Sequence, residues 1–234
     1  MTRSPPREFT VQAKRLLTPN MWRVTLGGAG MAGFPAGYSG GSIKLLFTQP
    51  GSDRPLRRTY TVRQQNAATI DIDVVRHAQG GPAARWAEQA TAGDHIQASG
   101  PAAPKRLNPT ADWFLLTGDM TALPAISTAI ERLPANARGR AIIEVIDPAD
   151  IHPPAAPPRL PIDWLINPTP GQRAELLAQT VRDMPWQTGQ PSVWAAGEFR
   201  AMRVLKAYLR DERELERGFM YIASYWQLGQ PEVG

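Results

Sequence analysis

The sequence predicts two domains of different class, an antiparallel β-barrel over residues 1–103 and an α/β domain with a parallel sheet over residues 110–234. Three observations predict this division. The first half consists of short strand-like segments separated by Gly and Pro turns. The second half alternates apolar strands with amphipathic helices, which is the pattern of parallel βαβ units covered on both faces. With 234 residues, the chain is long enough for two domains of ordinary size.

The N-terminal half contains six segments that we predict to be strands of a small barrel. The clearest is TIDIDVVRH, in which Ile70, Ile72 and Val74 recur every second residue, as expected for a strand with one buried face. A short helix is predicted over PAARWAEQA, residues 82–90. The six predicted strands are 9–17, 21–28, 42–48, 58–64, 69–77 and 94–100.

The C-terminal half begins with WFLLTG, a continuous apolar strand that is followed by an amphipathic helix. The same alternation continues to the end of the chain and predicts a parallel sheet. The predicted strands are 113–118, 140–146, 162–166, 192–198 and 219–226, and the predicted helices are 122–133, 173–184 and 199–213.

Composition excludes several classes of function. The chain has no cysteine, so disulfides, Cys-ligated zinc, iron–sulfur clusters and thiol nucleophiles are ruled out. No segment is apolar enough for a membrane span, and the N-terminus lacks the apolar region of an export signal, so we expect a soluble cytoplasmic protein. A net charge of +5 without a Lys/Arg tract favours small anionic ligands over nucleic acid.

The stretch RRTYTVR, residues 57–63, places three cations and an aromatic ring on one predicted strand. Side chains alternate along a strand, so Arg58, Tyr60 and Val62 should share one face, and Arg57, Thr59, Thr61 and Arg63 the other. The simpler interpretation is an edge strand protected by positive charge. The functional interpretation is an anion site, because guanidinium groups bind phosphate and a tyrosine ring packs on a flat conjugated system.

About twenty residues later, Gly80, Gly81 and Pro82 precede the short predicted helix. Glycines allow a ligand to approach the backbone closely, and the free amides near Ala83 and Ala84 lie at the positive end of the helix dipole. Alone, such a motif is more often a simple turn. Together with the arginine-rich strand, it predicts a site for a pyrophosphate.

These segments resemble the siderophore-interacting proteins, a branch of the ferredoxin reductase-like flavoproteins. The family motif Arg-x-Tyr-Thr-x-Arg corresponds to residues 58–63, and DIDVVRHAQGGPAARWAEQATAGDHIQASGP resembles its next conserved block. LLTGDMTALPAI is similar to the opening of its second domain, and WAAGEFRAMRVLKAYLRDE with SYWQLG to its C-terminal signature. The resemblance implies an FAD-binding barrel followed by an NAD(P)-binding-like α/β domain.

The resemblance also implies roles for individual residues. Tyr60 would lie against the flavin of FAD, Thr61 would contact its edge, and two arginines would hold phosphate or flavin oxygens. Trp86 has a simpler interpretation as a core anchor of its helix. The residues assigned to the cofactor are Arg58, Tyr60, Thr61, Arg63, Asp73, Val75, His77, Gly81, Ala83, Ala84 and Thr121.

In the second domain, TGDMTALP replaces the G-x-G-x-x-G fingerprint at a strand end that opens a helix. Ligands of such sheets gather at the carboxyl ends of strands, so two strand ends would face a nicotinamide nucleotide. For Glu198, a simpler role is to complement the dipole of its own helix. The residues assigned to the nicotinamide are Gly118, Asp119, Ala122, Ala196, Gly197 and Glu198, with Thr121 beside them.

The resemblance implies an FAD-dependent ferric-siderophore reductase with NAD(P)H or a ferredoxin as electron donor. The flavin carries the chemistry, so we assign no catalytic side chain and no metal ligand. Lys44, Lys105 and Arg106 would attract an anionic ferric siderophore, although each is also an ordinary surface cation. Gln227 stands where the family tends to have a basic residue, and GPAAPKRLNP replaces its Gly-Pro-Arg-Gly.

Three other functions remain open at this stage. The first is a general flavin or ferredoxin reductase, and the second is a siderophore-binding module without catalysis. A basic nucleic-acid binder ranks last, because the chain has no aromatic and basic platform. We expect a monomer without membrane or nucleic-acid partners. The sequence does not distinguish NADH from NADPH.

Overall fold

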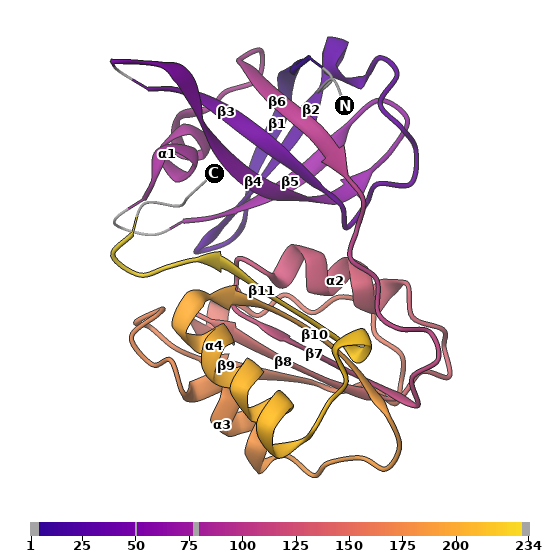
Figure 1. The fold of residues 1–234 in the computed structure, drawn as a ribbon. Coiled ribbons are helices and arrows are strands. Elements are labelled where there is room, and N and C mark those ends of the chain that lie inside the picture. Colours follow the sequence, from indigo (N-terminus) through magenta and orange to yellow (C-terminus); the bar gives the residue numbers. More distant parts are fainter. Residues whose placement is uncertain (1–4, 50, 77–79, 231–234) are drawn as a thin grey trace. The chain divides into compact units, whose positions relative to one another are not determined.

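The computed structural model describes residues 5–49, 51–76 and 80–230. These residues divide into two compact units, which meet in the chain between Pro104 and Lys105. The first unit contains a closed antiparallel barrel, and the second contains a parallel sheet with helices. Both predicted fold classes are therefore confirmed (Figure 1).

In the barrel, the strands follow the order β1-β2-β5-β4-β3-β6. Alternating apolar residues fill its interior, and Ile70, Ile72 and Val74 are completely buried, as their two-residue period predicts. The strands are β1 (Arg7–Thr18), β2 (Met21–Gly27), β3 (Ser42–Gln49), β4 (Ser52–Gln65), β5 (Ile70–Val75) and β6 (His95–Ala102).

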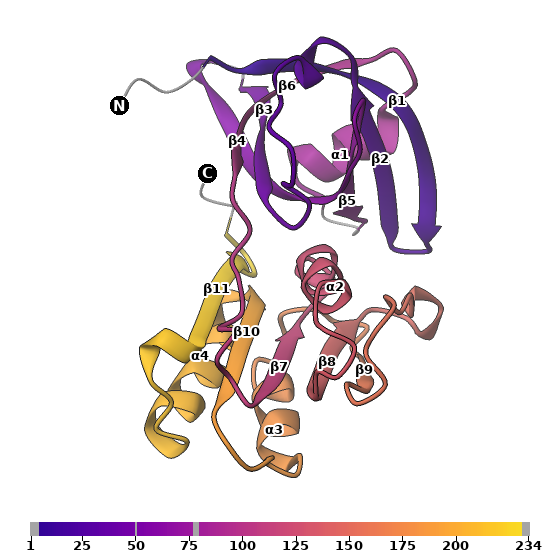
Figure 2. The ribbon, with the colours of Figure 1, turned by 90° about the vertical axis from the view of Figure 1, so that its right-hand side faces the viewer.

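Helix α1 (Pro82–Gln89) packs against one opening of the barrel. Figure 2 looks into the barrel and shows α1 at its far end. The ring of Trp86 contacts that of Phe47 edge to face, with 6.2 Å between the ring centroids. Ala87 is fully buried in the barrel core. Trp86 therefore anchors α1 to the barrel core, as its simpler interpretation predicts.

In the second unit, five parallel strands follow the order β11-β10-β7-β8-β9. Helix α2 (Leu123–Glu131) lies on one face of the sheet, and α3 (Leu176–Asp183) and α4 (Phe199–Ala207) lie on the other (Figures 1 and 2). The strands are β7 (Trp113–Gly118), β8 (Gly139–Val145), β9 (Ile162–Ile166), β10 (Pro191–Glu198) and β11 (Met220–Trp226).

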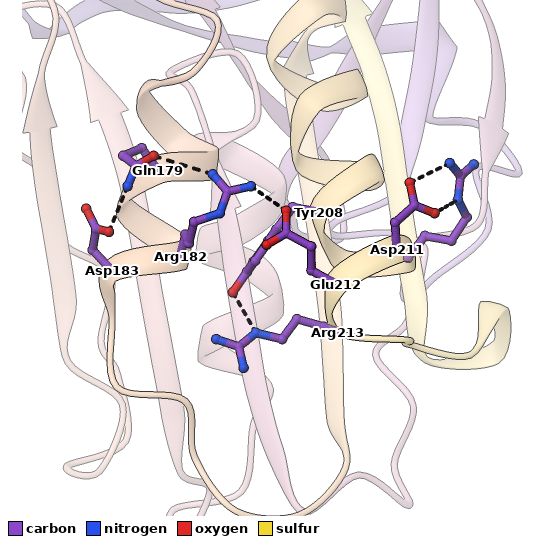
Figure 3. A network of polar contacts seen from close by, with 8 residues as sticks. Gln179, Arg182, Asp183, Tyr208, Asp211, Glu212 and Arg213 are labelled. Carbon is purple, nitrogen blue, oxygen red and sulfur yellow. Dashed lines mark hydrogen bonds and ion pairs between the residues drawn. The ribbon is translucent and has the colours of Figure 1, made fainter.

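The helix predicted over residues 199–213 is shorter in the structure, because α4 ends at Ala207 and continues as a π-helical turn, η3 (Tyr208–Glu212). Side chains tie this turn to α3 (Figure 3). Arg182 donates a hydrogen bond to Glu212 over 2.7 Å, and Arg213 donates to the Tyr208 hydroxyl over 2.6 Å. These contacts stabilise the π-helical turn at the point where the i to i−4 backbone hydrogen bonds of α4 end.

Candidate functional site

Strand β4, which carries the RRTYTVR stretch, lies inside the barrel wall and pairs with both β3 and β5. The edge-strand interpretation is therefore wrong. Arg58 lies opposite Leu45, and Tyr60 lies opposite Ile43. Directly opposed residues of antiparallel strands point to the same face, so Arg58 and Tyr60 share the face of these buried aliphatic residues. Only 4% of Arg58 is exposed.

The regular alternation of β4 ends at a β-bulge between Val62 and Gln64. Thr61 is buried opposite Ser42, on the face that alternation predicts. Arg63 lies within the bulge, where an extra residue interrupts the pairing with β5. A bulge changes the direction in which a side chain is presented, so the position of Arg63 does not follow from counting residues along the strand.

Asp73 on β5 is held by Arg23 on β2, a residue that the sequence does not single out. The two residues are opposite each other in the strand register. Arg23 donates two hydrogen bonds to the two carboxylate oxygens of Asp73, over 2.6 and 2.7 Å. The negative charge of Asp73 is therefore neutralised by its own chain before an anionic ligand approaches. Val75 is half-buried at the end of the strand, and His77 lies outside the described residues.

Among the described residues, no side chain caps the N-terminus of α1. Gly81 is the N-cap residue, and a Cβ built on it would meet none of their atoms within 4 Å. Pro82 fills the first turn, Ala83 is buried and Ala84 is half-buried. The first amides of a helix have no partner within the helix, and they attract an anion through the helix dipole. The open space at the Cβ position of Gly81, at the start of this turn, is compatible with a phosphate group.

The barrel residues fit the requirements of FAD. A buried guanidinium at Arg58, a half-buried aromatic ring at Tyr60 and the uncapped start of α1 provide groups for phosphate, ring system and pyrophosphate. Arg58 and α1 both belong to the barrel unit, and α1 packs on the same core that the inner face of β4 lines. Asp73, the carboxylate among the residues assigned to the cofactor, is paired with Arg23.

In the second unit, the sheet reverses its strand order between β7 and β10. The chain proceeds from β7 outwards to β8 and β9, and then returns to β10 and β11 on the other side. Gly118 at the end of β7 lies opposite Ala196 on β10, and a Cβ on Gly118 would come within 2.2 Å of the Ala196 carbonyl oxygen. Only glycine fits this close approach. The predicted nicotinamide residues are thus brought together at a topological switch point.

Asp119, which follows β7, accepts hydrogen bonds from several parts of the unit. Its donors are the amide and hydroxyl of Thr121, the Glu198 amide over 2.9 Å and the Trp226 indole Nε1 over 2.7 Å. Burial raises the pKa of the Asp119 carboxyl, and these hydrogen bonds act in the opposite direction. Asp119 therefore connects the ends of β7, β10 and β11.

Glu198 is the N-cap residue of α4, so its carboxylate lies at the positive end of the helix dipole that its simpler interpretation assigns to it. One oxygen accepts from the amides of Arg200 and Ala201, and the other accepts from the Leu228 amide over 3.2 Å. The carboxylate thus satisfies the first turn of its helix and is 3% exposed. In contrast, Ala122, the N-cap residue of α2, provides no side-chain cap, and the amides of Ala122 and Leu123 donate to the Asp119 carbonyl oxygen over 3.0 and 3.1 Å.

Two further residues at this edge, Glu144 and Asn167, carry no sequence motif. Glu144 lies on β8 and accepts a hydrogen bond from Asn167 Nδ2 over 2.8 Å. Burial raises the pKa of Glu144 to about 7, and the charges of Asp119 and Glu198 act in the same direction. Even so, the described residues contain no group of three His, Asp or Glu side chains able to hold a metal ion.

Aromatic side chains of β10 and β11 lie beside this edge. Trp194 contacts the ring of Tyr221 with 5.4 Å between centroids, and the ring of Tyr225 with 6.4 Å. Burial raises the pKa of the Tyr225 hydroxyl. Gln227 is half-buried just after β11.

The three predicted substrate cations are exposed in the structure. Lys44 lies on β3 of the barrel unit, whereas Lys105 and Arg106 begin the second unit. Their assignment to a siderophore stays a prediction. No helix in the described ranges is both long and apolar enough to cross a membrane.

Comparison with known proteins gives matches over both units. The model of a siderophore-interacting FAD-binding domain matches residues 10–55 and 48–105, and the model of the siderophore-interacting protein matches residues 111–229. The chain is 34% identical over 248 residues to the ferric vibriobactin reductase ViuB of Vibrio cholerae, covering 97% of this chain and 91% of that protein.

Solved structures give a consistent result. A siderophore utilization protein from T. fusca superposes with a TM-score of 0.89 at 32% identity, covering 98% of this chain and 95% of the other. The ferredoxin reductase of carbazole 1,9a-dioxygenase superposes with a TM-score of 0.66 at 16% identity, covering 95% of this chain and 66% of the other. The second likeness concerns the fold alone and places the architecture among ferredoxin reductase-like folds.

Proposed function

The chain belongs to the siderophore-interacting protein family, and we propose that it binds FAD in its barrel and reduces ferric siderophores with electrons from NAD(P)H. The observation that carries this proposal is the uncapped N-terminus of α1. The open space beside Gly81 and the buried guanidinium of Arg58 are features of an anion site in a barrel matched by an FAD-binding domain model.

In this proposal, each barrel residue binds or orients the cofactor. Arg58 and Arg63 hold phosphate or flavin oxygens through charge-assisted hydrogen bonds. Tyr60 packs against the ring system, and the amides near Ala83 and Ala84 bind the pyrophosphate. The flavin, when bound, accepts two electrons as a hydride and delivers them singly to iron.

Iron is the substrate here and needs no protein ligand. Ferric iron is a hard cation that the oxygen donors of siderophores bind tightly, and ferrous iron is held less tightly, so reduction releases the metal. Each reduced flavin would reduce two ferric complexes by one electron each. Exposed Lys44, Lys105 and Arg106 are suited to attract an anionic complex.

The switch point between β7 and β10 supports a nicotinamide nucleotide as the electron donor. Gly118 keeps the end of β7 free of a side chain, and the strand order of the sheet reverses beside it. These are properties of the strand end that receives a dinucleotide in open α/β sheets. A ferredoxin is the alternative donor.

An anaerobic experiment tests the function and the donor together. The protein is loaded with FAD and mixed with NADH, NADPH or reduced ferredoxin, and the loss of flavin absorbance is followed. A ferric siderophore is then added, and ferrous iron is trapped with a colorimetric chelator. We expect flavin reduction by a nicotinamide nucleotide and two ferrous ions per reduced flavin. A protein that takes up no FAD would contradict the proposal. Faster reoxidation by quinones than by ferric siderophores would instead indicate a general flavin reductase.

A further inference from the structure

The end of β8 is the place where the adenosine ribose of a donor nucleotide would be recognised, and this step rests on the proposed function. In dinucleotide-binding sheets, the group that reads the ribose follows the second strand, about twenty residues beyond the first strand-to-helix turn. Here β7 is the first strand, and β8 pairs directly with it, with Gly118 opposite Ile143. The residues just after Val145 therefore occupy the ribose-reading position.

This position carries carboxylates and no cation. The chain from Glu144 to Asp150 reads EVIDPAD, and no Lys or Arg occurs before Arg159. Two of the three carboxylates are buried and serve the fold. Glu144 accepts from Asn167, and Asp150 is fully buried and accepts from the backbone amide of Asp147 over 3.1 Å. Asp147 is the exposed member of the set.

Asp147 is held in place but retains bonding capacity. It is the N-cap residue of the 3-10 turn η2 (Pro148–Asp150), in a capping box with Asp150. Its Oδ1 accepts from the Ala149 amide over 2.8 Å. In the capping box, the Asp147 side chain also accepts from the Asp150 backbone amide. A carboxylate has about four acceptor positions, so about two remain for a ligand hydroxyl. The extended backbone at Asp147, with φ −134 and ψ 149, requires no strain.

Cations of the neighbouring elements act on other carboxylates of the chain. Arg140, near the amino end of β8, forms an ion pair with Asp163 on β9. The charge of Arg173 acts on Glu144. A 2′-phosphate placed beside Asp147 would meet the negative charge of the Asp147 carboxylate, whereas a ribose with two hydroxyl groups would find an acceptor.

We propose that Asp147 selects NADH over NADPH, because its carboxylate accepts a hydrogen bond from a ribose hydroxyl and its charge repels a 2′-phosphate. The same residue reads the ribose whichever iron complex is the substrate. The selection therefore concerns the donor alone.

Binding of the oxidised nucleotides tests this inference without turnover. Isothermal titration calorimetry of the FAD-loaded full chain with NAD⁺ and NADP⁺ should give at least about tenfold tighter binding of NAD⁺, the ratio expected for a difference of one unfavourable charge contact. Stopped-flow bleaching of the flavin by NADH and NADPH should show the same order.

Variants of Asp147 distinguish an effect of its charge on nucleotide binding from an effect of its structural role. Asp147→Ser keeps a hydroxyl acceptor for the Ala149 amide and should reduce the ratio to about unity, whereas Asp147→Arg should favour NADP⁺. If Asp147→Arg does not fold, the serine variant carries the test. The matched control is Asp183→Arg. Asp183 ends α3, which leads into the amino end of β10, so the same change of charge occurs away from the strand ends that bind ligand.

Equal or tighter binding of NADP⁺ by the unaltered protein would overturn the inference, and so would a ratio that neither Asp147 variant changes. Failure of both nucleotides to bind would also overturn it. The proposed function is judged separately, because protein reduced by dithionite should still reduce a ferric siderophore in that case.

Discussion

Helices α1 and α4 both begin at predicted ligand sites, but only α4 is capped by a side chain. α1 starts at Gly81 beside open space, with no cap hydrogen bond. α4 starts at Glu198, whose carboxylate accepts from two amides of its first turn. An uncapped start can receive a phosphate, whereas a start that already holds a carboxylate repels one. The comparison indicates that the start of α1 can receive an anion and that the start of α4 is already occupied by a carboxylate of the chain.

The same contrast applies to the charged residues. In the barrel, the carboxylate of Asp73 is neutralised by Arg23, and Arg58 is buried on the inner face of β4. In the α/β unit, Asp119, Glu144 and Glu198 are buried close enough to influence one another. The first arrangement favours a negatively charged cofactor, and the second disfavours a phosphate group directly beside these three carboxylates.

The largest expected effect comes from removing the arginines of the barrel site. Arg58→Ala combined with Arg63→Ala should weaken FAD binding by about 100-fold or more, since charge-assisted hydrogen bonds contribute about 1.5–3 kcal/mol each. Flavin fluorescence on titration measures the affinity. The control is Arg57→Ala, which removes the neighbouring cation and should leave the affinity nearly unchanged. Unchanged affinity in the double variant would show that the site is assigned wrongly.

Glu144 in the α/β unit should make the stability of the protein depend on pH. Its pKa of about 7 in the folded protein lies above the ordinary value of 4.5, so the folded state binds more protons between these pH values. The free energy of unfolding therefore decreases as pH rises from about 4.5 to about 7. The decrease reaches its full size above pH 7, where Glu144 is ionised in the folded protein.

Glu144→Gln keeps an acceptor for Asn167 and removes this decrease. We expect the variant to be more stable at pH 8 by about 1–3 kcal/mol and to lose most of the advantage near pH 5. Chemical denaturation at both pH values measures the difference from the unaltered protein. A constant difference across this range would mean that Glu144 does not titrate there.

Removing the cap of α4 should destabilise the second unit without affecting the cofactor. Glu198→Ala leaves the amides of Arg200, Ala201 and Leu228 without this acceptor, and we expect a loss of about 1–2 kcal/mol. Glu175→Ala is the control, because Glu175 is the N-cap residue of α3 and makes no side-chain cap hydrogen bond. Equal losses in the two variants would contradict the special role of Glu198.

A side-chain cap at the start of α1 should make this helix start resemble that of α4. The space beside Gly81 accepts a side chain, so Gly81→Asp can fold and cap the helix, raising stability by roughly a few tenths of a kcal/mol. The new charge should weaken FAD binding by about tenfold. Gly81→Asn caps without charge and should weaken it less. If both variants bind FAD as tightly as the unaltered protein, the pyrophosphate does not bind at this helix.

Periodic patterns predicted much of this fold. Each predicted barrel strand has a counterpart, because buried residues such as Ile70 and Ile72 recur at the period of a strand. The register between strands cannot be read from such a period, and for this reason the Arg23–Asp73 pair was missed. The bulge at Arg63 and the π-helical turn after Ala207 were also missed, since both depend on tertiary packing.

The candidate site also contains residues that the sequence predicts and residues that it does not. Residues in motifs, such as Tyr60 and Asp119, could be proposed from the sequence, and their ligands stay predictions. Glu144 and Asn167 could not be found, because their contact joins two strand ends that are far apart in the chain. The Glu198 cap was foreseen as one of two alternatives, and the hydrogen bonds to α4 show that it is made.

Electron transfer from the bound flavin to iron is the most direct test of the account. The FAD-loaded protein is reduced anaerobically with dithionite, freed of excess reductant and mixed with a ferric siderophore, while flavin absorbance and ferrous iron are recorded together. The account predicts that the flavin absorbance returns as two ferrous ions form per flavin. Flavin that stays reduced in the presence of the ferric complex, with no ferrous iron released, would contradict it.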